Sequence, residues 1–220
     1  MRYDFHIHTH HSYDSMMKPS KILQLAKERG LHGVVICDHN TVAGGLETQA
    51  LNEDPDFEVI VGAEIRTNAG DITGIRISEE IVSREFEAVC DEIHAQGGQT
   101  ILVHPYVDHD LNLIDFDKID YVEVINARAS DAQNDLAYAL AVKYDKPMVA
   151  GSDAHLYSEI GNAETTIEYE SHHPKGTHKI KSSKKYHQTL SQYIKAYKQG
   201  KPMIAIQSSI YLIKRILSRV

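Results

Sequence analysis

The first fourteen residues concentrate side chains that bind metals. FHIHTHHSYD holds four histidines, at positions 6, 8, 10 and 11, and ends at Asp14. His6 and His8 close a β-rich run, and strand side chains alternate between two faces, so both imidazoles are expected on the same side. Asp153 and His155 repeat this spacing after a late β-rich run. One such pair also fits buried histidines that only need hydrogen bonds, but two pairs indicate a metal site.

Further metal-binding residue types end other β-rich runs. The runs predicted as strands are 2–8, 33–39, 58–65, 71–77, 99–105, 121–127, 147–153 and 164–170. Helical periodicity is expected in 19–29, 81–97 and 136–143. This β-α-β-α order predicts a parallel sheet or an α/β barrel, in which the C-terminal ends of the strands face the active site. The residues expected at that rim are His6, His8, His39, Glu64, His104, Asp153 and His155.

So many ligands predict a multinuclear centre. Seven or eight donors exceed what one ion with an open water position takes, and a carboxylate that bridges two cations is typical of phosphoester hydrolysis. Glu64, between apolar Ala63 and Ile65, is the expected bridge. Imidazoles with carboxylates suit Zn²⁺, Mn²⁺ or Fe²⁺, and no cysteine is expected among the ligands. Asp14 is either a turn residue or a further ligand, and Asp38 is expected to orient a ligand.

Composition and charge limit the class of protein, its compartment and its domain organisation. The 42% hydrophobic and 25% charged fractions of this 220-residue chain are those of a soluble globular protein. The chain starts without a signal-peptide pattern, and two cysteines, Cys37 and Cys90, favour a reducing cytoplasm. Residues 171–220 hold eleven Lys or Arg and no Asp or Glu, whereas residues 1–170 hold twelve basic and thirty-one acidic residues. We expect an acidic barrel over 1–170 and a basic segment over 171–220 packed on the same domain.

The motifs resemble those of the polymerase and histidinol phosphatase (PHP) domain hydrolases. DFHIHT with Asp14, CDHN at 37–40, GAEI at 62–65, VHP at 103–105 and GSDAH at 151–155 occur in the family's order. EVINAR at 123–128 is similar to a segment common in small members of the family. The resemblance implies a distorted, TIM-barrel-like (β/α)7 barrel of the PHP type, with a metal cleft at the C-terminal strand ends.

The resemblance also implies two or three divalent ions, of Zn, Mn or Fe, with Mg as a further option. Asp71 stands where many trinuclear members have a histidine, and this carboxylate favours harder cations such as Mn²⁺ or Mg²⁺. Carried over by position, one ion is held by His6, His8, Glu64 and Asp153, a second by Glu64, His104 and Asp71, and a third by Asp14, His39 and His155.

The expected activity is hydrolysis of a phosphate mono- or diester by metal-activated water. Arg128 is a candidate phosphate clamp, and His39 or His155 a candidate proton donor to the leaving oxygen. A small phosphorylated metabolite or nucleotide is the leading substrate. Two alternatives stay open: a 5'-3' exonuclease or nucleic-acid phosphodiesterase that uses the basic tail, and a non-catalytic metal-binding regulatory module.

The C-terminal segment leaves its own questions. Apolar residues recur near helical spacing over 203–217, which fits docking on the barrel, a dimer interface or, less favoured, a membrane surface. The tail histidines His172, His173, His178 and His187 are expected to be solvated, and His32, His94 and His109 to be ordinary loop or helix residues. His10 and His11 are expected to be bystanders near the cleft. The oligomeric state stays open.

Overall fold

The computed structural model describes residues 1–168, 174–201, 203 and 210. Its strands are β1 (Arg2–Ile7), β2 (Gly33–His39), β3 (Glu58–Thr67), β4 (Gly70–Ile75), β5 (Gln99–Leu102), β6 (Tyr121–Asn126), β7 (Met148–Gly151), β8 (Ala163–Ile167) and β9 (Pro174–Lys179). Its helices are α1 (Pro19–Glu28), α2 (Ala43–Leu51), α3 (Phe86–Ala95), α4 (Asp131–Lys143) and α5 (Lys185–Lys198), with short 3₁₀ turns at Leu111–Leu113 and Phe116–Lys118. No helix among these described residues is long and apolar enough to cross a membrane.

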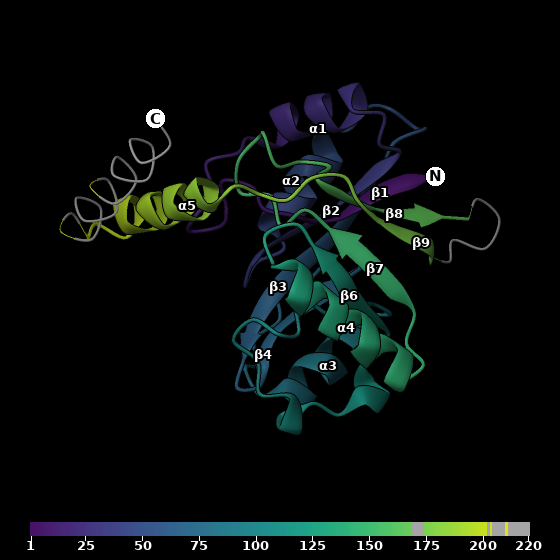
Figure 1. Cartoon of the computed structure of the whole chain (residues 1–220). Helices are drawn as coiled ribbons and strands as arrows, with labels where there is room; N and C mark the ends of the chain where they lie inside the picture. The colour runs from purple at the N-terminus through teal and green to yellow at the C-terminus, as the bar shows by residue number, and fades with distance from the viewer. Residues whose placement is uncertain (169–173, 202, 204–209, 211–220) are drawn as a thin grey trace.

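The sheet is a distorted seven-stranded barrel extended by a hairpin. Its strand order is β7-β6-β5-β4-β3-β2-β1-β8-β9. The barrel closes between β1 and the chain just after β7, where Ile7 pairs in parallel with Ala154 and the His8 amide donates to the Ala154 carbonyl at 2.9 Å. Figure 1 shows the strands wrapped in this way, with α3 and α4 packed outside them. The predicted fold class, a TIM-barrel-like (β/α)7 barrel, is confirmed.

Among the seven barrel strands, one departs from the parallel pattern, and the β8–β9 hairpin is also antiparallel to its neighbours. β4 runs antiparallel to both β3 and β5, because the chain turns directly between Thr67 and Gly70 with no helix between the strands. Gly70 has φ +125°, a conformation that side chains rarely adopt, so glycine permits this turn. The sequence pattern correctly predicted a strand here. Its direction was wrong, because strand periodicity carries no information on pairing direction.

Apolar side chains form two layers. Inside the barrel pack Tyr3, Phe5, Val35, Cys37, Ile60, Ile75, Ile101, Val103, Tyr121, Val149 and Ile167. Outside it, the helices bury their apolar faces on the sheet, as Ile22 and Leu23 of α1 and Val89 and Ile93 of α3 do. The helix expected over 81–97 begins only at Phe86, and Val82 is exposed in the preceding loop. The filled interior makes the barrel a rigid frame for residues at its rim.

Three elements were not expected from the sequence pattern. α2 carries two consecutive glycines, which lower helix propensity. Gly44 is required by space, since a Cβ there would lie 1.9 Å from Asp38 Oδ2 and 2.3 Å from Thr9 Oγ1. β9 pairs antiparallel with β8, and α5 follows it, so the basic segment contributes ordered elements. The apolar stretch 203–217 lies outside the described residues except for Met203 and Ile210.

Candidate metal centre

The C-terminal ends of the barrel strands bring the predicted ligands together. β1 supplies His6 and, directly after its end, His8; β2 supplies His39, and β3 supplies Glu64. The loops after β5 and β7 add His104, Asp153 and His155, and the loop after β1 adds Asp14. In all eight residues the side chain is at most 16% exposed: His6, His8, Asp14, His39, Glu64, His104, Asp153 and His155.

An irregularity in β1 aims its histidines into the barrel. The register of β1 against β2 shifts between Asp4 and Ile7. The buried carboxylate of Asp4 holds this shift, because it accepts the amides of His6 at 3.2 Å, Ser152 at 2.8 Å and Gly161 at 2.7 Å. Burial raises the pKa of Asp4 to about 6, against these hydrogen bonds. Such irregularities next to functional sites re-aim side chains, and this one ties β1 to the loop after β7.

Glu64 lies at the centre of the cluster. Its Oε1 is 2.9 Å from His104 Nε2, and its Oε2 is 2.9 Å from His39 Nδ1, 3.5 Å from His8 Nε2 and 3.7 Å from His6 Nε2. Burial acts to raise the pKa of Glu64, but His39 and His6 outweigh it and hold that pKa well below the usual range. One carboxylate therefore faces four imidazoles, as expected of a bridging ligand.

Asp153 and Asp14 complete two further faces of the cluster. Asp153 Oδ1 lies 3.5 Å from His8 Nε2 and 3.3 Å from His155 Nδ1. Asp14 Oδ2 lies 3.2 Å from His155 Nε2 and 3.4 Å from His39 Nε2. Asp153 has φ +53°, outside the usual range of a non-glycine residue. Strained backbone of this kind is typical of sites where side-chain direction is imposed by the surrounding structure.

The donor set fits divalent cations. Burial lowers the pKa of His8 to about 3, and the neighbouring His155 and His39 add to the effect, so its imidazole is neutral and has a lone pair to give. Two buried polar atoms of the cluster, Asp14 Oδ1 and His104 Nδ1, find no hydrogen-bond partner among the described residues. Glu64 Oε2 forms no well-directed hydrogen bond there, although His39 Nδ1 lies 2.9 Å away. Unsatisfied buried acceptors are costly without a cation. The cluster is therefore suited to hold metal ions.

Residues behind the cluster fix the ring orientations. Glu123 Oε1 lies 3.0 Å from His6 Nδ1, and Ser12 Oγ lies 3.1 Å from His8 Nδ1. Asp38 accepts the Ser12 hydroxyl at 2.6 Å, which agrees with the expectation that it orients a ligand. These contacts leave Nε2 of both histidines facing the cluster, where the two nitrogens are 3.1 Å apart. The sequence pattern singled out the EVINAR segment but did not assign this role to Glu123.

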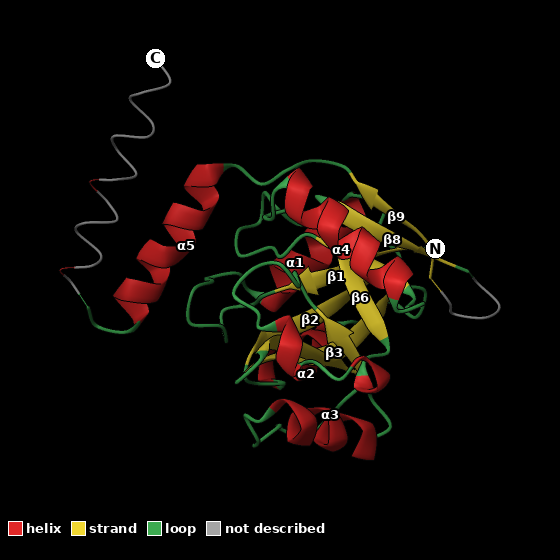
Figure 2. Cartoon of the chain, turned by 60° about the horizontal axis from the view of Figure 1, so that its bottom comes forward, coloured by secondary structure: helices red, strands yellow, loops and turns green. Residues whose placement is uncertain are grey.

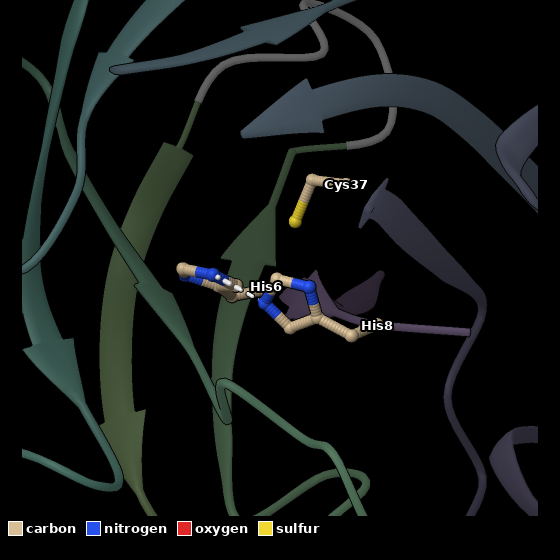
Figure 3. Close-up of side chains that lie close together, drawn as sticks. All are labelled: His6, His8 and Cys37. Atoms are coloured by element: carbon tan, nitrogen blue, oxygen red, sulfur yellow. Dashed lines mark hydrogen bonds between the residues drawn. The ribbon is translucent and has the colours of Figure 1, made fainter. Parts of the chain in front are cut away.

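Cys37 also reaches the cluster, which was not expected. Cys37 and His39 are two residues apart on β2, so both side chains point inward. Figure 3 shows the Cys37 sulfur turned toward the His6 and His8 rings. The thiol sulfur and a nitrogen of each histidine lie within 4.8 Å of one another. The sequence was expected to place no cysteine among the ligands, but the fold brings the Cys37 thiol within reach of two of the candidate ligands.

Asp71 lies at the edge of the cluster. Its carboxylate belongs to a group with Glu64 and His104 whose donor atoms lie within 4.8 Å of one another. Its Oδ2 also lies 3.0 Å from Arg66 Nη1, and burial together with Glu64 raises the pKa of Asp71. His109, expected to be an ordinary loop residue, lies beside this edge with its Nε2 2.9 Å from the Asp71 carbonyl.

Arg128 is committed to an internal ion pair. Its Nε and Nη2 donate to the two carboxylate oxygens of Glu159 at 3.0 and 2.7 Å, and its Nη1 donates to Ser191 of α5 at 3.1 Å. Glu159 is fully buried and accepts the His155 amide at 3.2 Å. The guanidinium fork that a phosphate clamp would use is thus already paired, so this geometry argues for a positioning role.

The basic segment reaches the mouth of the cleft. Figures 1 and 2 show α5 as a rod beside the barrel. Lys198 Nζ donates to the carbonyls of His10 at 2.6 Å and Ser12 at 2.7 Å. Lys195 Nζ lies 4.6 Å from the Tyr13 ring centroid, and Tyr13 stacks on His39 with centroids 4.5 Å apart. α5 therefore packs on the loop that carries Asp14.

The two described histidines of the basic segment differ in burial. His187 of α5 is 5% exposed, with its Nδ1 3.3 Å from Glu159 Oε1, so the expectation that it is solvated is wrong. Its helix packs against the barrel there. His178 in β9 is exposed, as expected, and His172 and His173 lie outside the described residues.

Comparison with known proteins finds one matching family model and several relatives in sequence. A family model described as PHP-associated matches residues 131–176. An uncharacterized protein of Methanocaldococcus jannaschii is 38% identical over 158 residues, which span 65% of this chain and 92% of that protein. A 5'-3' exoribonuclease of Haemophilus influenzae is 34% identical over 67 residues, 30% of this chain and 24% of that protein.

A solved structure shares the architecture. It is a two-domain protein from Bacteroides vulgatus that contains a predicted PHP-like metal-dependent phosphoesterase, with a TM-score of 0.60 and 20% identity over 70% of this chain and 52% of that chain. Fold and site together define a class of α/β barrels that carry a cluster of metal-binding side chains at the C-terminal ends of their strands. Within that class, the chain belongs to the PHP domain family.

Proposed function

We propose that the protein hydrolyses a phosphate mono- or diester in a metal-dependent reaction. The observation that carries the proposal is the convergence of eight imidazole and carboxylate side chains, none more than 16% exposed, with Glu64 at their centre. Within this cluster, Asp14 Oδ1 and His104 Nδ1 lack a hydrogen-bond partner among the described residues. Buried polar atoms without a partner are uncommon in folded proteins, and here they fall where metal ions would bind. Zn²⁺, Mn²⁺ or Fe²⁺ suits these donors, and Asp71 adds a hard ligand that also suits Mg²⁺.

The contacts support an assignment of two or three ions. His6, His8, Glu64 and Asp153 would hold the first ion. Glu64, His104 and Asp71 would hold the second, and Asp14, His39 and His155 the third. When bound, the ions supply Lewis-acid activation of water and neutralise the phosphoryl oxygens.

The protein's own groups position the substrate and move protons. The acidic carboxylates of the cleft would repel a phosphate without cations, so binding depends on metal loading. His39 and His155 lie on the Asp14 side of the cluster, within 3.4 Å of its carboxylate. When the third position holds no ion, either imidazole could donate a proton to a leaving alkoxide, and Asp14 would stabilise the charged imidazolium form. With an ion in that position, all three residues would serve as its ligands. Tyr13 stacks on His39 and keeps its ring plane fixed.

A small substrate fits the placement of α5 better than a polymer. Three lysines of the basic segment already have partners in the protein: Lys179 with Asp131 at 2.7 Å, Lys195 with Tyr13, and Lys198 with two loop carbonyls. The Tyr13 ring stacks on His39 and also contacts Lys195, which leaves little of the ring free to stack on a nucleic-acid base. The partial match to an exoribonuclease favours the nucleic-acid alternative, so this second candidate is tested alongside the first.

The test compares metal-dependent hydrolysis by matched variants. Protein stripped of metal and reloaded with Mn²⁺, Zn²⁺ or Fe²⁺ is assayed on p-nitrophenyl phosphate, bis-p-nitrophenyl phosphate, a nucleotide panel and short single-stranded RNA. Asp153→Ala should abolish turnover while circular dichroism stays native. Asp91 is an exposed carboxylate on α3 that pairs with Lys118, so Asp91→Ala is the control and should keep full activity. Activity that survives both Asp153→Ala and chelation rules out the proposal.

The substrate profile separates the candidates. Hydrolysis of the small esters with little salt dependence supports the metabolite or nucleotide reading. RNA cleavage that falls steeply with salt supports the nuclease, since backbone contacts release counterions. Stoichiometric metal binding without turnover of any ester supports the regulatory module.

A further inference from the structure

Two histidines of the opening cluster lie outside the cleft, yet face a common carboxylate. His10 and His11 follow β1 in a loop, and Glu47 lies on α2. Glu47 Oε2 is 2.7 Å from His11 Nε2 and 3.7 Å from His10 Nε2, and the two imidazole centroids are 4.4 Å apart. The donor atoms of all three residues lie within 4.8 Å of one another. None of the three belongs to the candidate metal centre.

The backbone that carries these histidines is held on both sides. The His10 amide donates to the Met17 carbonyl at 2.7 Å, and the His11 amide donates to Thr9 Oγ1 at 3.1 Å. Lys198 of α5 donates a hydrogen bond to the His10 carbonyl at 2.6 Å. The loop thus holds both imidazoles near Glu47 without any ion, which lowers the ordering cost of binding one.

The donors match a borderline transition-metal ion. Imidazole nitrogens and one carboxylate oxygen bind Zn²⁺, Cu²⁺ or Ni²⁺ in preference to Mg²⁺ or Ca²⁺. Bond lengths near 2.0–2.1 Å in a tetrahedral site put donor atoms about 3.3 Å apart. The two separations of 2.7 and 3.7 Å bracket that value, so small side-chain rotations suffice. Side chains 31–41% exposed leave room for water or an anion at the remaining position.

An ordinary surface ion pair is the competing explanation, and the chain contains one for comparison. His94 lies 2.9 Å from Asp120 with both side chains similarly exposed. That pair has one imidazole, and none of the candidate donor groups found among the described residues includes it. At the rim, two imidazoles converge on a single carboxylate oxygen, which an ion pair does not require.

We propose that His10, His11 and Glu47 form a second metal site at the rim of the cleft, which takes one Zn²⁺-class ion. The ion cross-links the loop after β1, which also carries Asp14, to α2. It therefore holds the entrance of the cleft in place. This site does not depend on the function proposed for the cleft.

The experiment uses full-length protein whose cleft is first saturated with Zn²⁺ and freed of loosely bound ion by gel filtration. Equilibrium dialysis with further Zn²⁺ should show one additional equivalent. His11→Ala and Glu47→Gln should each weaken this binding about tenfold or more, because each removes one of three donors. His94→Ala should not change it. Loss of the additional equivalent in Asp153→Ala, or its retention in His11→Ala, overturns the proposal.

Electron paramagnetic resonance identifies the donors directly. Cu²⁺ added to the Zn²⁺-saturated protein should show superhyperfine splitting from two imidazole nitrogens, reduced to one in His10→Ala. An unchanged splitting pattern in His10→Ala contradicts the site even if binding is weakened. Circular dichroism of each variant reports whether the chain still folds.

Discussion

A substitution at Glu123 tests whether this carboxylate orients His6 and fixes its tautomer for metal binding. Its Oε1 lies 3.0 Å from His6 Nδ1, and its Oε2 accepts the His104 amide at 2.8 Å and the Asn126 side chain at 3.0 Å. Glu123→Gln keeps the shape but replaces one oxygen by an NH₂ group. No orientation of this amide satisfies all three contacts while His6 keeps its proton on Nδ1.

The two orientations have different consequences. If the amide oxygen faces His6, the NH₂ group meets two donors, and each buried donor left without an acceptor costs about 1–3 kcal/mol. If the oxygen faces His104 and Asn126, His6 Nδ1 must accept, which moves the ring proton to Nε2. Nε2 is the atom that faces His8 and Glu64. The second orientation avoids two unpaired donors, so it should prevail and oppose metal binding.

The expected result is a loss of metal affinity larger than the loss of stability. Removing an orienting carboxylate typically costs about 10–100-fold in affinity, which is about 1.4–2.7 kcal/mol. Competition with a chromophoric chelator measures the affinity for Zn²⁺, and urea unfolding of the metal-free protein measures stability. Glu58→Gln, which loses a charge beside Tyr3 and Arg76, is the control and should leave Zn²⁺ affinity unchanged. Wild-type Zn²⁺ affinity in Glu123→Gln would refute the reasoning.

Three further variants address α5 and its anchors. Arg128→Leu leaves the buried Glu159 charge unpaired and should destabilise the fold by about 3–5 kcal/mol in urea; a higher KM with unchanged stability would instead indicate a phosphate clamp. Burial lowers the pKa of His187, so stability is lost as pH falls through the ordinary range of histidine. The drop in urea midpoint from pH 7.5 to 5.5 should shrink in His187→Gln but not in His94→Gln. Lys198→Met removes two hydrogen bonds to the carbonyls of His10 and Ser12. The free energy of local opening around positions 10–14, measured by hydrogen exchange, should fall by about 1 kcal/mol, a value already reduced because Lys198 is partly exposed to solvent.

The candidate ligands were accessible to sequence reasoning because their signals are local. His6 and His8, like Asp153 and His155, reveal a shared direction through strand alternation, and apolar runs mark where the strands end. The polar residues at those ends then fall on one rim if the strands close into a barrel. The barrel class and the convergence of these side chains followed from this logic. The order of β1 to β7 and their closure through Ile7 and Ala154 agree with it.

Contacts between residues far apart in the chain needed the tertiary structure. Glu123 lies behind His6 across 117 positions, and no periodicity in either segment encodes that pairing. Arg128 was expected to be a phosphate clamp because nothing in the sequence pairs it with Glu159, 31 positions away, whose carboxylate is buried only after folding. The same holds for β4, whose direction depends on which neighbours it meets, and for His187 of α5, which was expected to be solvated but is buried beside Glu159. Residue type and spacing thus determined which side chains could bind metal, and folding decided which of them are oriented, paired or left available.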